Sequence, residues 1–362
     1  FFRKDIIKVF MSKSLTRALI ISIWVFLLAC FLYGPRFSSV SKDSINVFTW
    51  GGILNEEIIQ SFERKTGIRV NINNYSSNEE LIMKLKTTEG QGYDLVIPSD
   101  YAVSILVKNQ LIKELDRKQL SFFHQLLPGL LGRFFDPENR YSIPLSWEVY
   151  GLGIDRDFFT KPFTPSWSMI FDPKVVDYRI VMVNDPIEAI KIAGFYLYGS
   201  TSSLSKIQAE KVKDLLIQQK PWVAAYASSR ADYFLATKNS PLAVASSSYI
   251  FRSKRNFSFV DFVVPKEGSF ISIENLCIPK TCDKDSLVYQ FINHLYQRES
   301  IRVYWDSFRL FPSVDDKQDL NFDPQAQEIF YGLAEDFKKY HFFKSLLPQQ
   351  KIRDIWVEVK VN

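Results

Sequence analysis

Short apolar runs alternate with segments of helical periodicity along the first third of the chain. Strands are predicted at 45–50, 68–72 and 94–97. Helices are predicted after these strands, at 55–65, 78–86 and 103–111. Strands that alternate with helices are typical of βαβ units, so we expect an α/β fold whose sheet is mainly parallel.

The second half of the chain shows a similar alternation. The run 180–183 predicts a strand, and 186–197 predicts the helix that follows it. Further elements are predicted at 206–219 (helix), at 242–245 and 259–264 (strands), and at 286–298, 300–308 and 324–340 (helices). The sequence contains no internal repeat, and its 362 residues are enough for two domains of ordinary size.

Two carboxylates stand three residues apart where the predicted strand 180–183 passes into a helix. Asp185 is a preferred N-cap residue, Pro186 suits the first helical position, and Glu188 would complete a capping box. Helix capping alone therefore explains the pair locally. A cation site is the second interpretation, because two carboxylates more than offset the positive end of the helix dipole.

Polar and aromatic residues follow the carboxyl ends of other predicted strands in the same way. Trp50 ends the first strand, and Ser99 and Tyr101 follow the third. Ligands of open α/β sheets bind beyond the carboxyl ends of the strands. The repetition favours a ligand site that includes Asp185 and Glu188, because a capping box predicts nothing about the other junctions.

The charge of the chain is concentrated near its N-terminal end. The formal net charge is +5, and residues 1–29 carry +4 of it, so the remainder is nearly neutral. Because a nucleic-acid partner would require a strongly basic surface, we do not expect one.

The N-terminal residues are similar to a bacterial export signal. From Met11, basic residues precede the apolar run 18–33, which is shorter than the ~20 residues of a membrane-spanning helix. The run contains LLAC, which resembles a lipobox whose cysteine, Cys30, becomes acylated. The expected segments are a signal peptide with lipobox at 11–30 and a tether at 31–43. We therefore expect a periplasmic protein attached to a membrane by lipid; an ordinary signal peptide or an uncleaved anchor is the alternative.

Motifs of catalysis are missing from the sequence. It has no G-x-S-x-G, Walker A, H-E-x-x-H or G-x-G-x-x-G motif, so we expect a binding protein without catalytic residues or a cofactor rather than an enzyme. The three histidines are scattered, which disfavours a metal site. Cys277 and Cys282 lie close together, and a disulfide between them stays open.

Six segments of the chain occur in an order and spacing that resemble one known family. They are FTW at 48–50, SFERKTGIRV at 61–70, NEELIMKLKT at 78–87, YDLVIPSDYAV at 93–103, FDPENRYSIPLSW at 135–147 and VVPKEGSFISIENLCIP at 263–279. Over these segments the chain resembles the substrate-binding proteins of bacterial spermidine/putrescine ABC transporters.

The resemblance implies a type II periplasmic-binding-protein fold, in which two α/β lobes are joined by crossover hinge segments near Trp147 and Glu274. The implied lobes are 44–149 with 274–319, and 150–273 with 320–362. It also implies a polyamine ligand, an ABC permease of the inner membrane as partner, and a monomeric protein.

The resemblance further implies the residues of the ligand site. By position they are Trp50, Ser99 and Tyr101 from the first lobe, Asp185 and Glu188 from the second, and Glu274 from a crossover segment. A polyamine is a chain of methylenes with ammonium groups, and each ammonium group needs acceptors such as carboxylates. Aromatic rings cover the methylenes and attract the positive charges.

Several positions depart from the family pattern and leave the identity of the ligand open. Ile53 stands where Tyr is usual, and Ser246 and Ser272 stand where Trp is usual. Glu274 replaces an Asp, and Asp100 adds an acid next to Tyr101. A shorter diamine, a modified polyamine or another cation such as ferric iron are alternatives, and so is a membrane-attached interaction protein on a degenerate binding fold.

Overall fold

The computed structural model of the chain describes residues 21–24, 43–200, 202–227, 230–315, 320–335 and 339–361. The chain divides into two units, 1–42 and 43–362, and the fold below is that of the second unit. Cys30, the predicted lipobox and the tether before residue 43 lie outside the described residues. Among the helices that are described, none combines the length and the apolar character needed to span a membrane.

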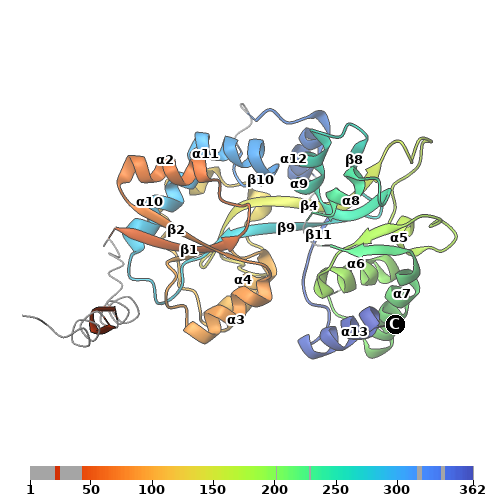
Figure 1. Cartoon of the computed structure of the whole chain (residues 1–362), viewed down its shortest axis with the longest axis horizontal. Coiled ribbons are helices and arrows are strands. Elements are labelled where there is room, and N and C mark those ends of the chain that lie inside the picture. The colour runs from red at the N-terminus through yellow and green to blue at the C-terminus, as the bar shows by residue number, and fades with distance from the viewer. Residues whose placement is uncertain are drawn as a thin grey trace, which may run out of the picture. The chain divides into compact units, whose positions relative to one another are not determined.

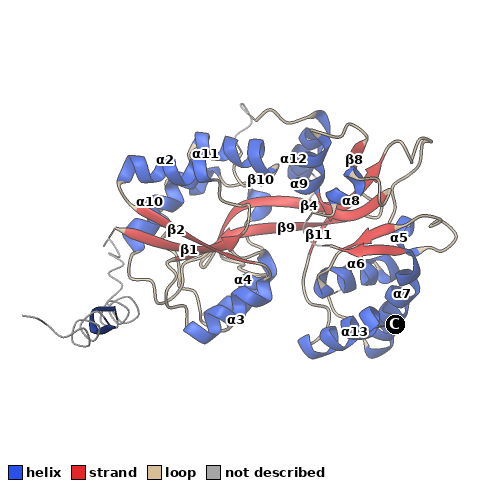
Figure 2. Cartoon of the chain, in the orientation of Figure 1, coloured by secondary structure: helices blue, strands red, loops and turns tan. Residues whose placement is uncertain are grey.

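A small parallel sheet carries the first βαβ units. Its order is β2-β1-β3, with β1 at Ser44–Trp50, β2 at Arg69–Tyr75 and β3 at Leu95–Val96. The helices that follow the strands are α2 (Glu56–Thr66), α3 (Asn78–Thr88) and α4 (Asp100–Lys108). Figure 2 shows α2 on one side of the β1–β2 pair and α3 and α4 on the other. The predicted alternation of strands and helices is confirmed here.

Helix α2 begins and ends where the sequence supplies caps. The side chain of Asn55 accepts a hydrogen bond from a backbone N–H of the first turn, and Gly67 ends the helix with φ of 73°. On the buried face, the ring of Phe62 lies 5.0 Å, centroid to centroid, from that of Phe291 in α10 (Asp285–Leu295). The apolar spacing seen in the sequence thus points into the core.

A mixed sheet of eight strands forms the second part of the fold. Its order is β11-β9-β4-β7-β5-β6, and β8 and β10 also pair with β4. Its strands are β4 (Ile143–Asp155), β5 (Ile180–Met182), β6 (Val223–Tyr226), β7 (Leu242–Ser246), β8 (Val260–Val263), β9 (Ser269–Leu276), β10 (Phe311–Pro312) and β11 (Tyr340–Phe342). Because β4 runs antiparallel to β7, β8 and β9, the expectation of a mainly parallel sheet is wrong for this part.

The remaining α-helices lie after β4 along the chain. They are α5 (Ser168–Phe171), α6 (Pro186–Tyr198), α7 (Lys206–Gln219), α8 (Asp232–Ala236), α9 (Ser247–Lys254), α11 (Arg298–Val303), α12 (Pro324–Glu335) and α13 (Gln349–Val361), with a π-helical turn at Tyr304–Phe308. Helix α13 packs against α6 and α7 (Figure 1). This contact brings the last described helix close to the start of α6.

The long strands β4 and β9 connect the two sheets (Figure 1). An isolated β-bridge between Ser99 and Glu274 joins β9 to the end of the first sheet. Trp147 of β4 is fully buried and stacks on Phe311, with ring centroids 4.5 Å apart. Trp147 is therefore a packing residue, whereas the predicted lobe bounds and the hinge stay predictions.

The C-terminal third is less helical than its local pattern indicates. Of the predicted helix 324–340, Pro324–Glu335 is described as α12, whereas Tyr340–Phe342 forms β11, which pairs in parallel with β9. The predicted helix 300–308 divides into α11 and the π-helical turn. Strand β11 is stabilised by its pairing with a distant strand, and local periodicity contains no information about such a partner.

Candidate ligand-binding cavity

One cavity of about 740 Å³ is bounded by strand ends and helix starts from both sheets. All six residues predicted for the ligand site line it, namely Trp50, Ser99, Tyr101, Asp185, Glu188 and Glu274. The fold thus brings together residues that are far apart in the chain.

Asp185 caps α6 with one of its two carboxylate oxygens. Its Oδ1 accepts hydrogen bonds from the backbone N–H of Ile187 at 2.7 Å and of Glu188 at 3.0 Å. Burial raises the pKa of Asp185 to about 6, and the charge of Glu79 adds to the rise, while the two backbone hydrogen bonds oppose it. Because capping uses Oδ1 alone, Asp185 can cap α6 and still offer its other oxygen to a ligand.

Glu188 faces the cavity instead of completing a capping box. Its Oε1 accepts a hydrogen bond of 2.8 Å from the hydroxyl of Tyr150 on β4. Its Oε2 is buried and has no hydrogen-bond partner among the described residues. Burial raises the pKa of Glu188 well above its ordinary value, and the charge of Asp185 raises it further. The capping box considered from the sequence is therefore wrong for Glu188.

Glu274 and Ser99 form the link between β9 and the first sheet. The hydroxyl of Ser99 donates to Oε1 of Glu274 at 2.8 Å. The other oxygen, Oε2, is buried without a partner in the described part of the chain. Burial raises the pKa of Glu274 well above its ordinary value, although the bond from Ser99 opposes this. Glu274 thus brings a second half-satisfied carboxylate into the cavity.

Two further carboxylates extend this acidic lining. Glu148 of β4 and Asp100 of α4 both line the cavity, and Glu148 Oε2 and Asp100 Oδ2 are buried without partners among the described residues. Burial raises the pKa of both groups, that of Asp100 strongly. Sequence reasoning noted Asp100 but missed Glu148. The period-two spacing of Glu148 and Tyr150 places both on one face of β4, but the spacing alone does not tell which face meets the cavity.

Aromatic rings form the apolar part of the cavity wall. Trp50 lies 4.6 Å, centroid to centroid, from Tyr75, and both line the cavity. The hydroxyl of Tyr101 donates to Glu79 Oε1 at 3.4 Å. Tyr226 of β6 also lines the cavity and was missed, because β6 was not predicted as a strand.

The departures from the family pattern fall on the cavity or beside it. Ile53 and Ser272 line the cavity, whereas Ser246 lies behind Ser248, with their hydroxyl oxygens 3.0 Å apart. Arg252 brings a positive charge into the cavity wall, and its Cζ lies 4.6 Å from the centroid of the Tyr249 ring. The cavity is therefore acidic but not uniformly so.

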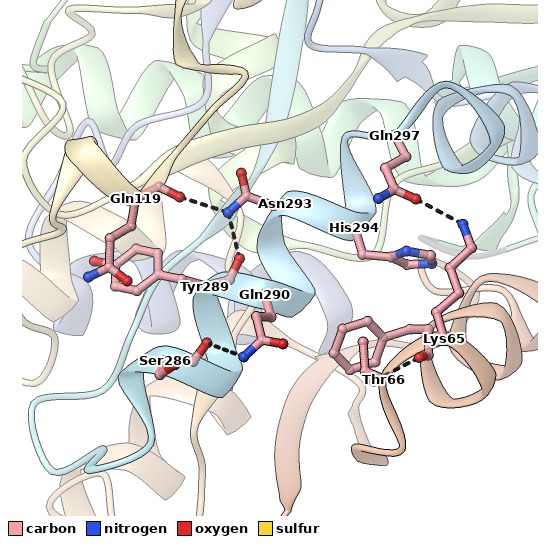
Figure 3. Close-up of a pocket in the computed structure, with 10 residues that line it drawn as sticks. Lys65, Thr66, Gln119, Ser286, Tyr289, Gln290, Asn293, His294 and Gln297 are labelled. Carbon is pink, nitrogen blue, oxygen red and sulfur yellow. Dashed lines mark hydrogen bonds between the residues drawn. The ribbon is translucent and has the colours of Figure 1, made fainter.

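A second, smaller cavity lies between α2 and α10 and contains none of the predicted residues. Its volume is about 440 Å³. Its polar side chains have partners within the protein: Lys65 Nζ donates to Gln297 Oε1 at 3.1 Å, and Asn293 Nδ2 donates to the backbone carbonyl oxygens of Gln119 and Tyr289 (Figure 3). Among the described residues that line this cavity, no buried side-chain charge lacks a partner.

The described residues contain no group of three His, Cys, Asp or Glu side chains arranged to hold a metal ion. Cys277 and Cys282 are both buried and unpaired, so the structure has no disulfide between them. The chemistry of the larger cavity is that of carboxylates, hydroxyls and aromatic rings.

Comparison with known proteins identifies the family. A family model described as bacterial extracellular solute-binding protein matches residues 57–328. The chain belongs to this family. The class of function predicted from the sequence, solute binding, is thereby confirmed.

Relatives within this solute-binding family agree with the resemblance seen in the sequence. The spermidine/putrescine-binding periplasmic protein of Salmonella typhimurium is 29% identical over 304 residues, which cover 80% of this chain and 86% of the relative. The putrescine/cadaverine-binding protein of Pseudomonas aeruginosa is 29% identical over 281 residues, which cover 74% and 79%. The predicted resemblance is therefore confirmed.

A solved structure supports the fold. A putative spermidine/putrescine ABC transporter protein from Listeria monocytogenes superposes with a TM-score of 0.79 and 24% sequence identity, covering 88% of this chain and 99% of that one. The predicted type II periplasmic-binding-protein fold of the α/β class is confirmed.

Proposed function

We propose that this chain is the extracytoplasmic solute-binding component of an ABC importer, and that it binds a polyamine such as spermidine or putrescine in the larger cavity. The proposal rests on one observation above all. Four buried carboxylates of the cavity each keep an oxygen without a partner among the described residues. The ligand classes named for the relatives agree with it.

These half-satisfied carboxylates require a counter-charge. Their partnerless oxygens are Asp100 Oδ2, Glu148 Oε2, Glu188 Oε2 and Glu274 Oε2. Burying ionised oxygens without partners costs several kcal/mol, and ammonium groups with three N–H donors each relieve that cost. A ligand with two ammonium groups would satisfy carboxylates from both sheets at once.

The rest of the cavity wall suits the methylenes of such a ligand. The rings of Trp50, Tyr101 and Tyr226 offer apolar faces, and each cation–π contact contributes ~0.5–2 kcal/mol. Each charge-assisted hydrogen bond contributes ~1.5–3 kcal/mol. After the cost of association, about −8 kcal/mol remains, which corresponds to a micromolar dissociation constant.

Calorimetric titration of residues 43–362 with putrescine and spermidine tests this proposal. We expect a micromolar Kd for at least one of them, and no binding of 1,4-butanediol, which has a similar length but no charge. If neither heat nor a shift in Tm appears with any polyamine, the proposal is wrong, and the interaction-protein alternative takes its place.

We further propose that the protein works in the periplasm, is attached to a membrane by lipid at Cys30, and delivers its ligand as a monomer to an ABC permease in the inner membrane. The LLAC sequence and the extracellular solute-binding family support this. The full chain should incorporate labelled palmitate, and Cys30→Ala should not. Equal incorporation by the two proteins, or none by either, would contradict lipid attachment at Cys30.

A further inference from the structure

An ammonium group of the protein itself lies in an aromatic cage beside the cavity. Nζ of Lys360, on α13, lies 3.4 Å from the ring centroid of Tyr226 and 4.7 Å from that of Trp356. The two rings meet nearly edge to face, 5.5 Å apart at 83°. Nζ also donates to Oδ1 of Asn184 at 2.8 Å. Two rings and an amide oxygen are the partners that an organic ammonium ligand would use.

This cage shares a wall with the larger cavity. Tyr226 and Asn184 contact Lys360 and also line the cavity. Asn184 immediately precedes Asp185, the cap of α6. The hydroxyl of Tyr226 is buried and has no hydrogen-bond partner in the described part of the chain. The fixed ammonium therefore lies next to the acidic lining, at one edge of it.

The sheet order places two positive charges of the protein on opposite flanks of the carboxylates, Lys360 on one side and Arg252 on the other. Strand β5 leads into α6, at whose start Asp185 and Glu188 lie. Strand β6, with Tyr226, lies on one side of β5. Strand β7 lies on the other side and leads into α9, which carries Arg252. Arg252 lines the cavity. A ligand that extends from the carboxylates in either direction along the sheet thus approaches a cation of the protein.

We propose that Lys360 is a specificity-determining residue, whose ammonium occupies the subsite beside Tyr226 that the end ammonium of a triamine would need, so that the cavity favours a short diamine. This inference rests on the proposed function. The two ammonium groups of putrescine are satisfied by the central carboxylates. The third charge of spermidine has to approach Lys360 on one flank or Arg252 on the other, and like charges at short range repel each other.

Lys360 keeps its charge at neutral pH although its environment disfavours the charged form. Burial lowers the pKa of Lys360 to about 8, and the nearby charge of Lys220 lowers it further. Lys220 Nζ also donates to the carbonyl oxygen of Lys360 at 2.7 Å, which holds the end of α13. At pH 7 most molecules therefore carry the ammonium in the cage.

Calorimetry on wild type and Lys360→Met tests the inference, because methionine keeps the packing against Trp356 and removes the charge. We expect the ratio of spermidine to putrescine affinity to rise roughly tenfold or more in Lys360→Met. Lys360→Arg, which retains a cation, should keep the wild-type ratio. Lys360→Gln is the second neutral variant, used if the Met variant has a lowered Tm.

Lys351→Met is the matched control. Lys351 is on the same helix, but its Nζ lies 2.8 Å from Glu210 Oε1, and neither residue lines the cavity. Its affinity ratio should stay at the wild-type value, within about twofold. If wild type binds both amines and the neutral Lys360 variants keep its ratio, the inference is overturned and the proposed function stands. If no polyamine binds wild type or any variant, the inference and the proposed function are both wrong. If spermidine binds only the neutral variants, the inference is supported.

Discussion

The larger cavity and the smaller one between α2 and α10 differ in whether their polar groups are satisfied. In the smaller cavity, Asn293, Lys65 and their neighbours form hydrogen bonds with one another (Figure 3). In the larger one, carboxylates from β4, β9, α4 and α6 each keep one buried oxygen without a partner among the described residues. The presence of a cavity says little about function; unsatisfied buried charge points to a ligand that would satisfy it.

The largest expected effect comes from removing that unsatisfied charge. Glu188→Gln with Glu274→Gln keeps the hydrogen bonds from Tyr150 and Ser99, because the amide oxygen still accepts. Loss of two charge-assisted hydrogen bonds, about 3–6 kcal/mol in total, should weaken polyamine binding by more than a hundredfold. The Tm of the ligand-free protein should not fall, because both carboxylates have raised pKa values and burial penalises their charge.

A matched control removes two carboxylates elsewhere. Glu210→Gln with Glu358→Gln deletes the ion-pair partners of Lys213, 2.7 Å and 2.9 Å from its Nζ. Calorimetry should give the wild-type polyamine affinity for this variant. An equal loss of affinity in both double variants would mean that net charge matters and the position of the carboxylates does not.

A smaller effect is expected from pH. The pKa of Asp185 is raised to about 6 by burial, and those of Glu188, Glu274 and Asp100 are raised in the same direction. Affinity for a polyamine should fall as pH decreases from 7.5 to 5, and protonation of Asp185 alone should account for a loss of roughly tenfold, because its pKa of about 6 lies one unit above pH 5. Titration at several pH values checks this, and a flat profile would contradict it.

The stability of the ligand-free protein should change in the opposite sense. A carboxyl group with a folded-state pKa above its unfolded value stabilises the fold when it is protonated, and loses that contribution as pH rises through the folded pKa. For Asp185 the window runs from about 4, its unfolded value, to about 6. Asp185 should therefore add more to the stability of the fold at pH 5 than at pH 7.5. Thermal melts check this: the Tm of wild type minus that of Asp185→Asn should be larger at pH 5.

The smallest effect on binding is expected in the smaller cavity. Asn293→Ala removes the donors to Gln119 and Tyr289 and the acceptor for Ser121. The free energy of unfolding should fall by about 1 kcal/mol, while polyamine affinity is unchanged. Denaturant unfolding and calorimetry measure the two quantities separately. Reduced affinity in this variant would break the distinction between the cavities.

The sequence predicted those features that depend on local signals. The N-cap at Asp185 was predicted from its residue type and from Pro186 after it, and it forms as expected. The position of Trp50, Ser99 and Tyr101 at the carboxyl ends of β1 and β3 was enough to place them together, since these two strands are neighbours. Asp185 follows β5 of the other sheet, so its place in the same cavity depends on how the two sheets are arranged.

Features that depend on distant partners could not be predicted in this way. Glu148 lies on a strand whose neighbours come from far along the chain, and local alternation does not say which face of β4 meets the cavity. Lys360 reaches the cavity wall only because α13 packs on α6 and α7. Strand β11 likewise exists through its pairing with β9. Long-range packing decides each of these.

A crystal structure of residues 43–362 with putrescine at pH 7.5 tests the central claim most directly. The account predicts ammonium nitrogens about 2.7–2.9 Å from the oxygens that now lack partners, including Glu188 Oε2 and Glu274 Oε2. The methylenes should lie against the rings of Trp50 and Tyr101. Putrescine bound elsewhere, or a saturated crystal whose carboxylates make no contact with it, would contradict the account.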